Sequence, residues 1–337
     1  MIDSIEITRF RGIREGKLEG LTPLTVLVGP NGCGKSTVLD AMLIGGTREP
    51  SEAVIEVVER HRDVEQGPRW LFWKGEHRNP AEITLTASNE CVRECQLKRI
   101  QETREKKSDI RISCNAELQT PSGALSQKSA IEFPQFSPAS FHTDGYGIFP
   151  EELPPVKLVE ARGNGRQVPL HQLYSETRKV GRREETRALI TDVVPGSKDI
   201  EILTEGDKPI VYLIYKDGAV PAALSGDGIH ALVRVTLELA ACSDGVVLFE
   251  EPEVHQHPGA IRQSIRAILA AVRRNIQVVL TTHSLELIDA LLAESSDEDL
   301  ERLSLYRLEL EDGQLISVRQ PGSEVAFSRC EIEKDLR

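Results

Sequence analysis

The sequence predicts an α/β fold built around a parallel sheet, with a less regular part in the middle of the chain. Two short segments, 246–249 and 278–281, are continuously apolar, which is typical of strands buried on both faces of a parallel sheet. A glycine-rich loop over 29–36 follows a third apolar segment and precedes an amphipathic one. A length of 337 residues suits about two domains, or one α/β domain that carries a large insertion.

The chain is acidic and has the composition of a folded globular protein. It contains 41 Lys and Arg against 53 Asp and Glu, a formal net charge of −12, with 39% hydrophobic and 28% charged residues. This composition excludes disordered, collagen-like and disulfide-scaffold proteins. The net charge argues against a surface covered with nucleic acid, although a local basic groove is compatible with it.

The expected location is cytoplasmic, with no membrane partner. Residues 1–10 include Asp3 and Glu6 and lack the apolar core of a signal peptide. No apolar run approaches the ~20 residues that span a bilayer. The six cysteines are scattered along the chain, which fits reduced intracellular thiols better than a disulfide framework: Cys33, Cys91, Cys95, Cys114, Cys242 and Cys330.

The first 49 residues are expected to form two strands, a bend, a third strand and a helix. Ile5 and Ile7 alternate with polar residues, Arg11-Gly12 marks the bend, and 24–28 is apolar. The helix follows the glycine-rich loop, because apolar residues recur at helical spacing over 38–43.

Residues 50–155 lack this regular pattern, and we interpret them as an inserted arm or lid. The range contains an aromatic cluster at 70–73, a charged run over 93–107 that we expect to be a solvated helix, and a tract rich in Pro, Ser and Phe over 120–155.

Regular structure returns at residue 156, so that 1–49 and 156–337 are predicted to form the main domain. We expect strands near 156–160, 200–204, 210–215, 246–249 and 278–281, helices over 182–193 and 229–241, and a hairpin of 303–310 and 314–318 around Glu311-Asp312-Gly313.

The glycine-rich loop matches the full G-x-x-x-x-G-K-[ST] pattern, in the strand-to-helix context that this pattern needs. Its glycines let backbone N–H groups converge on a polyphosphate at the N-terminus of a helix. Lys35 would reach the β- and γ-phosphates of ATP, and the Ser36 hydroxyl would bind Mg²⁺. The alternative is a glycine-rich turn with a chance lysine. The predicted nucleotide-binding residues here are Gly29, Pro30, Asn31, Gly32, Cys33, Gly34, Lys35, Ser36 and Thr37.

Two adjacent carboxylates, Glu250 and Glu251, follow the apolar segment 246–249. A buried strand would deliver them to its carboxyl end, which is the edge where open α/β sheets bind ligands. Glu250 can hold Mg²⁺, and Glu251 can orient or deprotonate an attacking water.

His283 follows the next buried strand, 32 positions after Glu251. A histidine in this position is often a cap or a core residue. If its strand neighbours the one that carries Glu251, His283 could instead contact the γ-phosphate as a catalytic residue.

The segment Ala223 to Gly228 opens a helix, with Ser225 as the expected N-cap. Its small residues leave the N-terminus of that helix open to an anion, although it can also be simply a capped helix start. If this segment bound a phosphate within its own chain, it would compete with the loop over 29–36 for that phosphate. The conflict disappears if the segment closes over the γ-phosphate held by a second subunit. The predicted nucleotide-binding residues of this segment are Ser225, Gly226, Asp227 and Gly228.

In chain order, these four elements resemble the Walker A, signature, Walker B and switch-histidine motifs of ATP-binding cassette (ABC) ATPase heads. The segment 5–12, the sequence 29–32 and the sequence 250–253 resemble the RecF/SMC branch, especially the OLD (overcoming lysogenization defect) family of AAA ATPases. The resemblance covers about 1–45 and 156–320. It implies an ABC ATPase head, with a RecA-like P-loop core and an N-terminal antiparallel β subdomain.

The resemblance also implies a homodimer or higher homo-oligomer that closes around ATP, with Arg11 and the D-loop residue His257 at the nucleotide. Glu250 stands where transporters usually have Asp, as in OLD-like proteins. The Q-loop glutamine is not identified; Gln66 and Gln135 are weak candidates. Only 54 residues follow His283, too few for the TOPRIM nuclease domain of most OLD proteins.

Three other patterns allow a different interpretation. His255-x-His257 occurs in metal sites, but no further ligands can be named beside it. The basic runs over 93–107 and 178–187 are typical of solvated helix faces, with DNA contact as the alternative. Trp70 and Trp73 flank apolar residues, so we expect them to pack in the core or at a subunit contact and not to stack on nucleic-acid bases.

These observations predict a Mg²⁺-dependent ATPase that gates a separately encoded effector, expected to be a nuclease, or that acts on DNA, as OLD-like proteins do in anti-phage defence. One alternative is a RecF-like ATPase of DNA repair and recombination. The other is a nucleotide-gated scaffold with negligible turnover.

Overall fold

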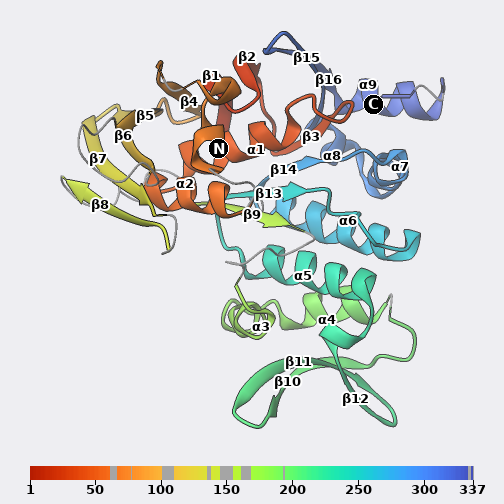
Figure 1. Cartoon of the computed structure of the whole chain (residues 1–337). Coiled ribbons are helices and arrows are strands. Elements are labelled where there is room, and N and C mark those ends of the chain that lie inside the picture. Colours follow the sequence, from red (N-terminus) through yellow and green to blue (C-terminus); the bar gives the residue numbers. More distant parts are fainter. Residues whose placement is uncertain are drawn as a thin grey trace. The chain divides into compact units, whose positions relative to one another are not determined.

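The computed structural model describes residues 1–60, 67–76, 78–100, 110–134, 138–144, 155–160, 168–192, 194–332 and 335–336. The chain divides into two compact units (Figure 1). The first unit comprises 1–22, 28–158 and 306–319, and the second comprises 23–27, 159–305 and 320–337.

The first unit contains a sheet that is mostly antiparallel, in the order β8-β7-β6-β5-β4-β1-β2-β16 (Figure 1). All neighbouring strands from β8 to β2 in this order pair antiparallel, and β16 pairs parallel with β2. The bounds are β1 Ile2–Phe10, β2 Ile13–Glu19, β4 Ala81–Ala87, β5 Val92–Ile100, β6 Ile110–Thr120, β7 Gly123–Phe133, β8 Ser140–Asp144 and β16 Gln314–Pro321.

Two helices, α1 (Lys35–Gly46) and α2 (Pro50–Glu59), cover one face of this sheet. Proline at the first position of α2 suits a helix start, because the N–H it lacks would have no partner there. Short 3₁₀ turns, η1 (Gly67–Leu71) and η2 (Trp73–Gly75), follow. The first of these packs on α2, and the backbone N–H of Arg11 donates to Leu71 O at 3.0 Å.

The charged run over 93–107 was expected to be a helix, and this expectation is wrong in its described part. Residues 93–100 lie in β5, where Arg93, Cys95 and Leu97 alternate with exposed residues and are buried. The side chain of Arg93 donates to Thr47 O, so a charged residue occupies an inward strand position. Because a charged residue, Arg93, occupies one of the inward positions, the alternation of apolar and polar residues that is typical of strands was not recognisable in the sequence.

The second unit is built on three parallel strands, in the order β3-β14-β13. β3 spans Leu24–Val28, β13 Val246–Glu250 and β14 Gln277–Thr281. Nearly every residue of the three strands is buried, as predicted for a sheet covered on both faces. The helices α5 (Asp227–Ala241), α6 (Pro258–Arg273) and α7 (Leu285–Glu294) belong to this unit (Figure 1).

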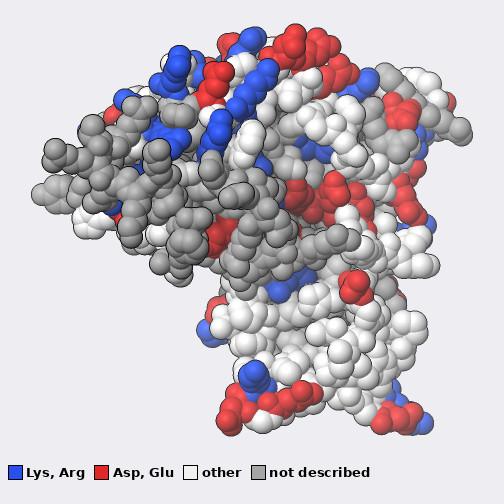
Figure 2. Space-filling view, in the orientation of Figure 1, with Lys and Arg blue, Asp and Glu red and all other residues white. Residues whose placement is uncertain are grey.

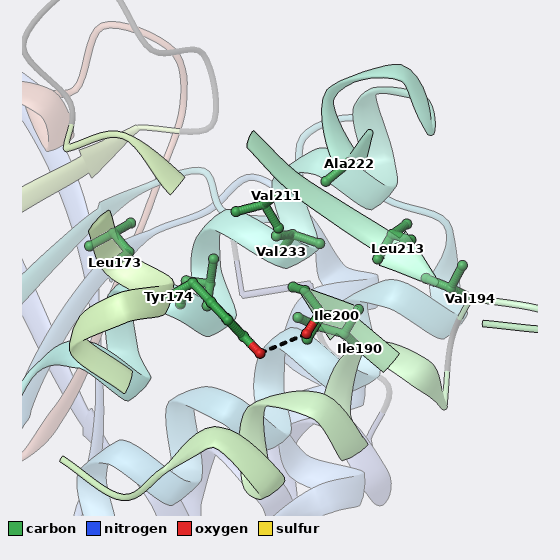
Figure 3. Packing of buried hydrophobic residues seen from close by; sticks show 10 residues of the cluster. Leu173, Tyr174, Ile190, Val194, Ile200, Val211, Leu213, Ala222 and Val233 are labelled. Carbon is green, nitrogen blue, oxygen red and sulfur yellow. Dashed lines mark hydrogen bonds between the residues drawn. The ribbon is translucent and has the colours of Figure 1, made fainter. Parts of the chain in front are cut away.

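A three-stranded antiparallel sheet with its own hydrophobic core forms another part of the second unit (Figure 3). Its strands are β10 Asp199–Glu205, β11 Lys208–Tyr215 and β12 Gly218–Pro221, and they pack with α3 (Leu170–Lys179) and α4 (Arg183–Thr191). Tyr174 lies in this core, and its hydroxyl donates to Ile200 O at 2.6 Å (Figure 3). The 3₁₀ turn η3 (Ala222–Leu224) then leads to α5.

Among the remaining elements, β9 and the hairpin of β15 and β16 follow the predicted positions, whereas the short helices α8 and α9 were not predicted. β9 spans Val156–Glu160 and β15 Leu303–Glu311, with α8 (Asp297–Glu301) before β15 and α9 (Gly322–Cys330) after β16. The turn between β15 and β16 contains Asp312 and Gly313, both with positive φ. The role of residues 50–155 as an arm or lid stays a prediction. No helix in the described part of the chain is long and apolar enough to cross a membrane.

Candidate nucleotide site

The glycine-rich loop leaves the carboxyl end of β3 and leads into α1, as predicted. Gly34 has a φ of 98°, a left-handed conformation that suits glycine, and it provides no side-chain cap for α1. The first backbone N–H groups of a helix have no partner within that helix. The N-terminus of α1 therefore presents free donors and partial positive charge, which fits a phosphate group.

Lys35 is buried, and the loop's own carbonyls surround its ammonium group. Nζ donates to Gly29 O at 2.9 Å and to Pro30 O at 3.1 Å, and it lies 3.7 Å from Cys33 Sγ. Two neutral oxygens orient the charge of Lys35 without cancelling it, so the loop keeps its attraction for an anion. The Ser36 and Thr37 side chains are half-buried beside it, and Ser36 can offer a hydroxyl to Mg²⁺.

Arg11 lies in the bend after β1 with a φ of 52°, and its guanidinium forms an ion pair with Asp40 of α1. Asp40 is fully buried and also forms an ion pair with Arg60, just after α2. Arg11 was predicted to contact the nucleotide, but neither Asp40 nor Arg60 was predicted. A polar residue inside the apolar stripe of α1 was the signal that could have identified Asp40.

The acidic pair lies at the carboxyl end of β13, the predicted edge. Glu250 is the last residue of β13, opposite Thr281 of β14. Glu251 follows with a φ of 46°, a conformation that is strained for a side chain of its size. Its backbone N–H donates to Thr281 O and to Thr281 Oγ1, each at 3.2 Å. These two bonds hold the strained backbone, and both carboxylates stay half-exposed.

His283 lies beside Glu251, as its place after the neighbouring strand predicts. Its Nε2 is 3.4 Å from Glu251 Oε1, and both side chains are about one third exposed. This separation is slightly longer than a hydrogen bond, and catalytic hydrogen bonds of this kind often shorten when substrate binds, so the imidazole and the carboxylate are close enough to act together at a solvent-accessible edge. The catalytic roles of the two residues stay predictions.

The segment 225–228 begins α5, but Ser225 is not its N-cap. α5 begins at Asp227, the cap position is Gly226 with a φ of 90°, and Ser225 Oγ donates back to Pro221 O at 3.2 Å. The N-cap prediction was therefore wrong, because the serine hydroxyl hydrogen-bonds to the residue before the 3₁₀ turn η3 and not to the first turn of α5. The N-terminus of α5 is still open, and Gly226 and Asp227 are exposed.

The loop between β13 and α6 lies against the start of α5. A Cβ atom added to Gly228 would meet His255 O at 2.5 Å, so only glycine permits this approach. His255 has a φ of 65°, a second left-handed residue within five positions of Glu251. His257 caps α6, accepting from Gly259 N–H at 3.2 Å through Nδ1. The family resemblance placed His257 at the nucleotide, and this cap was not predicted.

No group of three or more His, Cys, Asp or Glu among the described residues is arranged to hold a metal ion. Gln66 and Gln135, the two candidates for the Q-loop glutamine, lie outside the described residues, as do 101–107 of the first basic run. Acidic and basic side chains are mixed over the visible face of the first unit (Figure 2).

An uncharged surface segment of the second unit includes the start of the predicted signature. Residues 218–226 contain no charged side chain, and Leu224 is 76% exposed. The face of this unit between α5 and β10–β12 shows few Lys, Arg, Asp or Glu (Figure 2).

Two solved structures resemble the chain in fold. One is an Smc head domain with an extended coiled coil, bound to the C-terminal domain of ScpA from Pyrococcus furiosus, with 13% identity, a TM-score of 0.52 and 99% coverage of both chains. The other is an SmcHead bound to the C-winged helix domain of ScpA, with 12% identity, a TM-score of 0.51, and coverage of 96% of this chain and 99% of that one. The fold is therefore that of an ABC/SMC-type ATPase head.

Sequence comparison supports the same assignment. An ATP/GTP phosphatase of Helicobacter pylori is 22% identical over 86% of this chain and 87% of its own length. An uncharacterized protein of Methanocaldococcus jannaschii is 33% identical over 33% of this chain and 98% of its own length. An AAA domain model matches residues 4–143, and an AAA ATPase domain model matches residues 76–288. Because the latter covers more than half of the chain, the protein belongs to the AAA ATPase domain family.

Proposed function

We propose that this chain hydrolyses ATP with the help of Mg²⁺. Lys35 and the N-terminus of α1 bind the phosphates, and Ser36 and Glu250 hold Mg²⁺, which supplies charge neutralisation at the phosphates when it is bound. Glu251 accepts the proton of the attacking water, and His283 orients the water or the γ-phosphate.

The contact between Glu251 and His283 is the observation that carries this proposal. A base and its orienting partner 3.4 Å apart, at the carboxyl edge of a parallel sheet, fit hydrolysis better than binding alone. A scaffold that only binds nucleotide would need the phosphate loop but not this pair. The phosphatase activity named for the Helicobacter pylori relative supports the same reaction, with ATP or GTP as substrate.

The test is the turnover of MgATP and MgGTP by Glu251→Gln. We expect kcat to fall at least ~10²-fold, because a general base typically contributes that much or more. Nucleotide affinity, measured with a fluorescent ATP analogue, should stay within about twofold of the wild type. Glu286→Gln is the matched control, because Glu286 is an exposed acid in the first turn of α7. Wild-type turnover in Glu251→Gln would remove Glu251 from its assigned role.

We also propose that two chains close around ATP, the start of α5 in one chain facing the phosphate loop of the other. Its open N-terminus and the exposed Leu224 beside it support such a contact. Ser225→Arg places a bulky cation in this contact, so ATP should no longer shift a hydrolysis-deficient protein toward the dimer in light scattering. An ATP-dependent dimer that persists in this variant would refute the shared site.

The biological role proposed here is an OLD-like ATPase that gates a separately encoded effector, such as a nuclease, in anti-phage defence. The alternative RecF-like role predicts turnover that double-stranded DNA stimulates at physiological salt. Salt must be varied, since contacts to the phosphate backbone weaken steeply as salt rises. Turnover indifferent to DNA at every salt concentration favours the protein effector, and stimulation that survives physiological salt favours the DNA-acting role.

A further inference from the structure

One acidic residue of the loop after β13 is not used by the proposed mechanism. Glu253 follows Pro252 in the sequence Glu250-Glu251-Pro252-Glu253, and its side chain turns inward to the neighbouring strand end. Glu253 Oε1 accepts a hydrogen bond from the hydroxyl of Thr282, which directly precedes His283. The carboxylate also lies near the backbone N–H of His283, so it faces the residues that present the imidazole.

Thr282 is fully buried and is held by three hydrogen bonds. Its backbone N–H donates to Leu27 O at 3.1 Å, and its Oγ1 accepts from the N–H of Ser284 at 2.9 Å. A hydroxyl has one proton to give. Thr282 Oγ1 accepts from Ser284 and gives its proton to Glu253, so the hydroxyl links the start of the turn that carries His283 to the Glu253 carboxylate.

The loop that carries Glu253 is itself anchored to α6. Gln256 donates to Pro252 O at 2.6 Å through its side chain and accepts from Ser264 Oγ at 2.8 Å. The backbone N–H of Gln256 also donates to Glu253 O at 2.9 Å. Glu253 therefore connects a fixed loop to a fixed strand end, and the side chains of Glu251 and His283 extend from these two segments.

We propose that Glu253 is a positioning residue: as the acceptor for the Thr282 hydroxyl, it fixes the backbone that holds His283 beside Glu251. The inference rests on the proposed hydrolysis, for which His283 and Glu251 are the acting groups. What Glu253 must supply is an oxygen acceptor at a fixed place. A glutamine supplies it as well, whereas a leucine of similar size does not.

The same substitution should have opposite effects on turnover at the two neighbouring glutamates. Glu251→Gln removes a base and should abolish turnover, whereas Glu253→Gln should keep kcat within about threefold of the wild type. Glu253→Leu and Thr282→Val should lower kcat by about 10- to 100-fold, the usual effect of losing a residue that orients a reacting group. Thr282→Ser keeps the hydroxyl and should restore most of that loss. The KM for ATP should change less than twofold in all of these variants.

Measuring the Glu253→Leu effect in a chain that also carries His283→Ala separates a positioning role of Glu253 from a general packing defect. If Glu253 acts through His283, then Glu253→Leu should cause no further loss of kcat in a chain that already carries His283→Ala. A defect in packing would lower kcat in both backgrounds. An equal fold-loss with and without His283 would overturn the proposal, and so would wild-type turnover in Glu253→Leu.

A measurement without turnover keeps this inference distinct from the proposed function. In the full-length protein, amide hydrogen exchange of His283 and Ser284 should accelerate in Glu253→Leu and remain slow in Glu253→Gln. Unchanged exchange in Glu253→Leu would reject the positioning role even if the wild type hydrolyses ATP. Faster exchange in Glu253→Leu, together with a wild type that does not hydrolyse ATP, would reject the proposed function and retain the structural link between Glu253 and His283.

Discussion

His283 Nε2 lies 3.4 Å from Glu251 Oε1, and the two residues follow adjacent parallel strands, β14 and β13. Each of the two residues is also fixed by hydrogen bonds of its own segment. The backbone of Glu251 is fixed by two hydrogen bonds to Thr281, and the turn of His283 is fixed through Thr282. A pair whose backbones are fixed in this way requires little reorganisation when a reaction begins.

Removing the imidazole tests this pair directly. We expect His283→Ala to lower kcat by about 10²-fold and to leave ATP affinity within about twofold, because Lys35 and the N-terminus of α1 supply the main contacts that bind the phosphates, whereas the imidazole orients the reacting groups. Steady-state turnover combined with nucleotide titration checks both values. His171→Ala is the matched control, since His171 lies on α3 outside the site. A large loss of affinity in His283→Ala would assign the residue to binding instead.

The buried ion pairs of Asp40 should matter for stability. Asp40→Asn leaves the guanidinium groups of Arg11 and Arg60 without their shared carboxylate, and breaking a buried pair from one side typically costs about 3–5 kcal/mol. Urea denaturation should detect this loss in the free energy of unfolding. Glu176→Gln is the control, because its pair with Lys179 is exposed and should contribute less than about 1 kcal/mol. Equal stability of the two variants would contradict the structural importance of Asp40.

The sequence predicts the phosphate loop and the parallel strands well because both follow strong local rules. β3 spans the predicted residues 24–28, and β13 and β14 differ from prediction by one residue each. The closeness of Glu251 and His283 follows from topology, since adjacent parallel strands end at the same edge. The phosphate loop and the strands are short segments whose structure follows from the residues within and next to them.

The failures have a different cause, because they depend on specific side-chain contacts, most of them between residues far apart in the sequence. Arg93 looked solvated, yet it is buried in β5 and bonds to Thr47 O, 46 positions away. Ser225 looked like an N-cap, but the preceding 3₁₀ turn takes its hydroxyl. Thr282 and Glu253 were not recognised as partners because 29 positions separate them. No pattern of spacing or hydropathy in a single sequence identifies such pairs.

Gly228 should be sensitive to the smallest enlargement. Gly228→Ala places a Cβ atom 2.5 Å from His255 O, so either the start of α5 or the loop after β13 must move. We expect about 1–3 kcal/mol of destabilisation and loss of ATP-dependent dimerisation, since both segments belong to the proposed subunit contact. Gly259→Ala is the control, because its Cβ would meet only His257 Nδ1 at 3.6 Å, an ordinary contact in the first turn of α6. Thermal unfolding and light scattering check the two variants, and similar behaviour of both would contradict the close approach at Gly228.

Asp299 should contribute stability that depends on pH. The hydrogen bond from Arg273 lowers the pKa of this buried carboxyl from 3.8 to about 2, with help from the capping interactions of Ser296. A carboxyl whose pKa is lower in the folded state stabilises the fold fully above its unfolded pKa, near 3.8. That contribution is lost as the pH falls through the folded value of about 2.

The shift corresponds to about 2 kcal/mol at neutral pH. Asp299→Asn should therefore be less stable than the wild type by about that amount at pH 7, and the difference should shrink steadily below pH 4, since the wild type then loses the same interaction. Denaturant unfolding from pH 7 to the lowest pH at which the chain stays folded measures this convergence. A difference that stays constant over this range would mean that the Asp299 side chain stabilises the start of α8 through its shape and hydrogen bonds, and not through its charge.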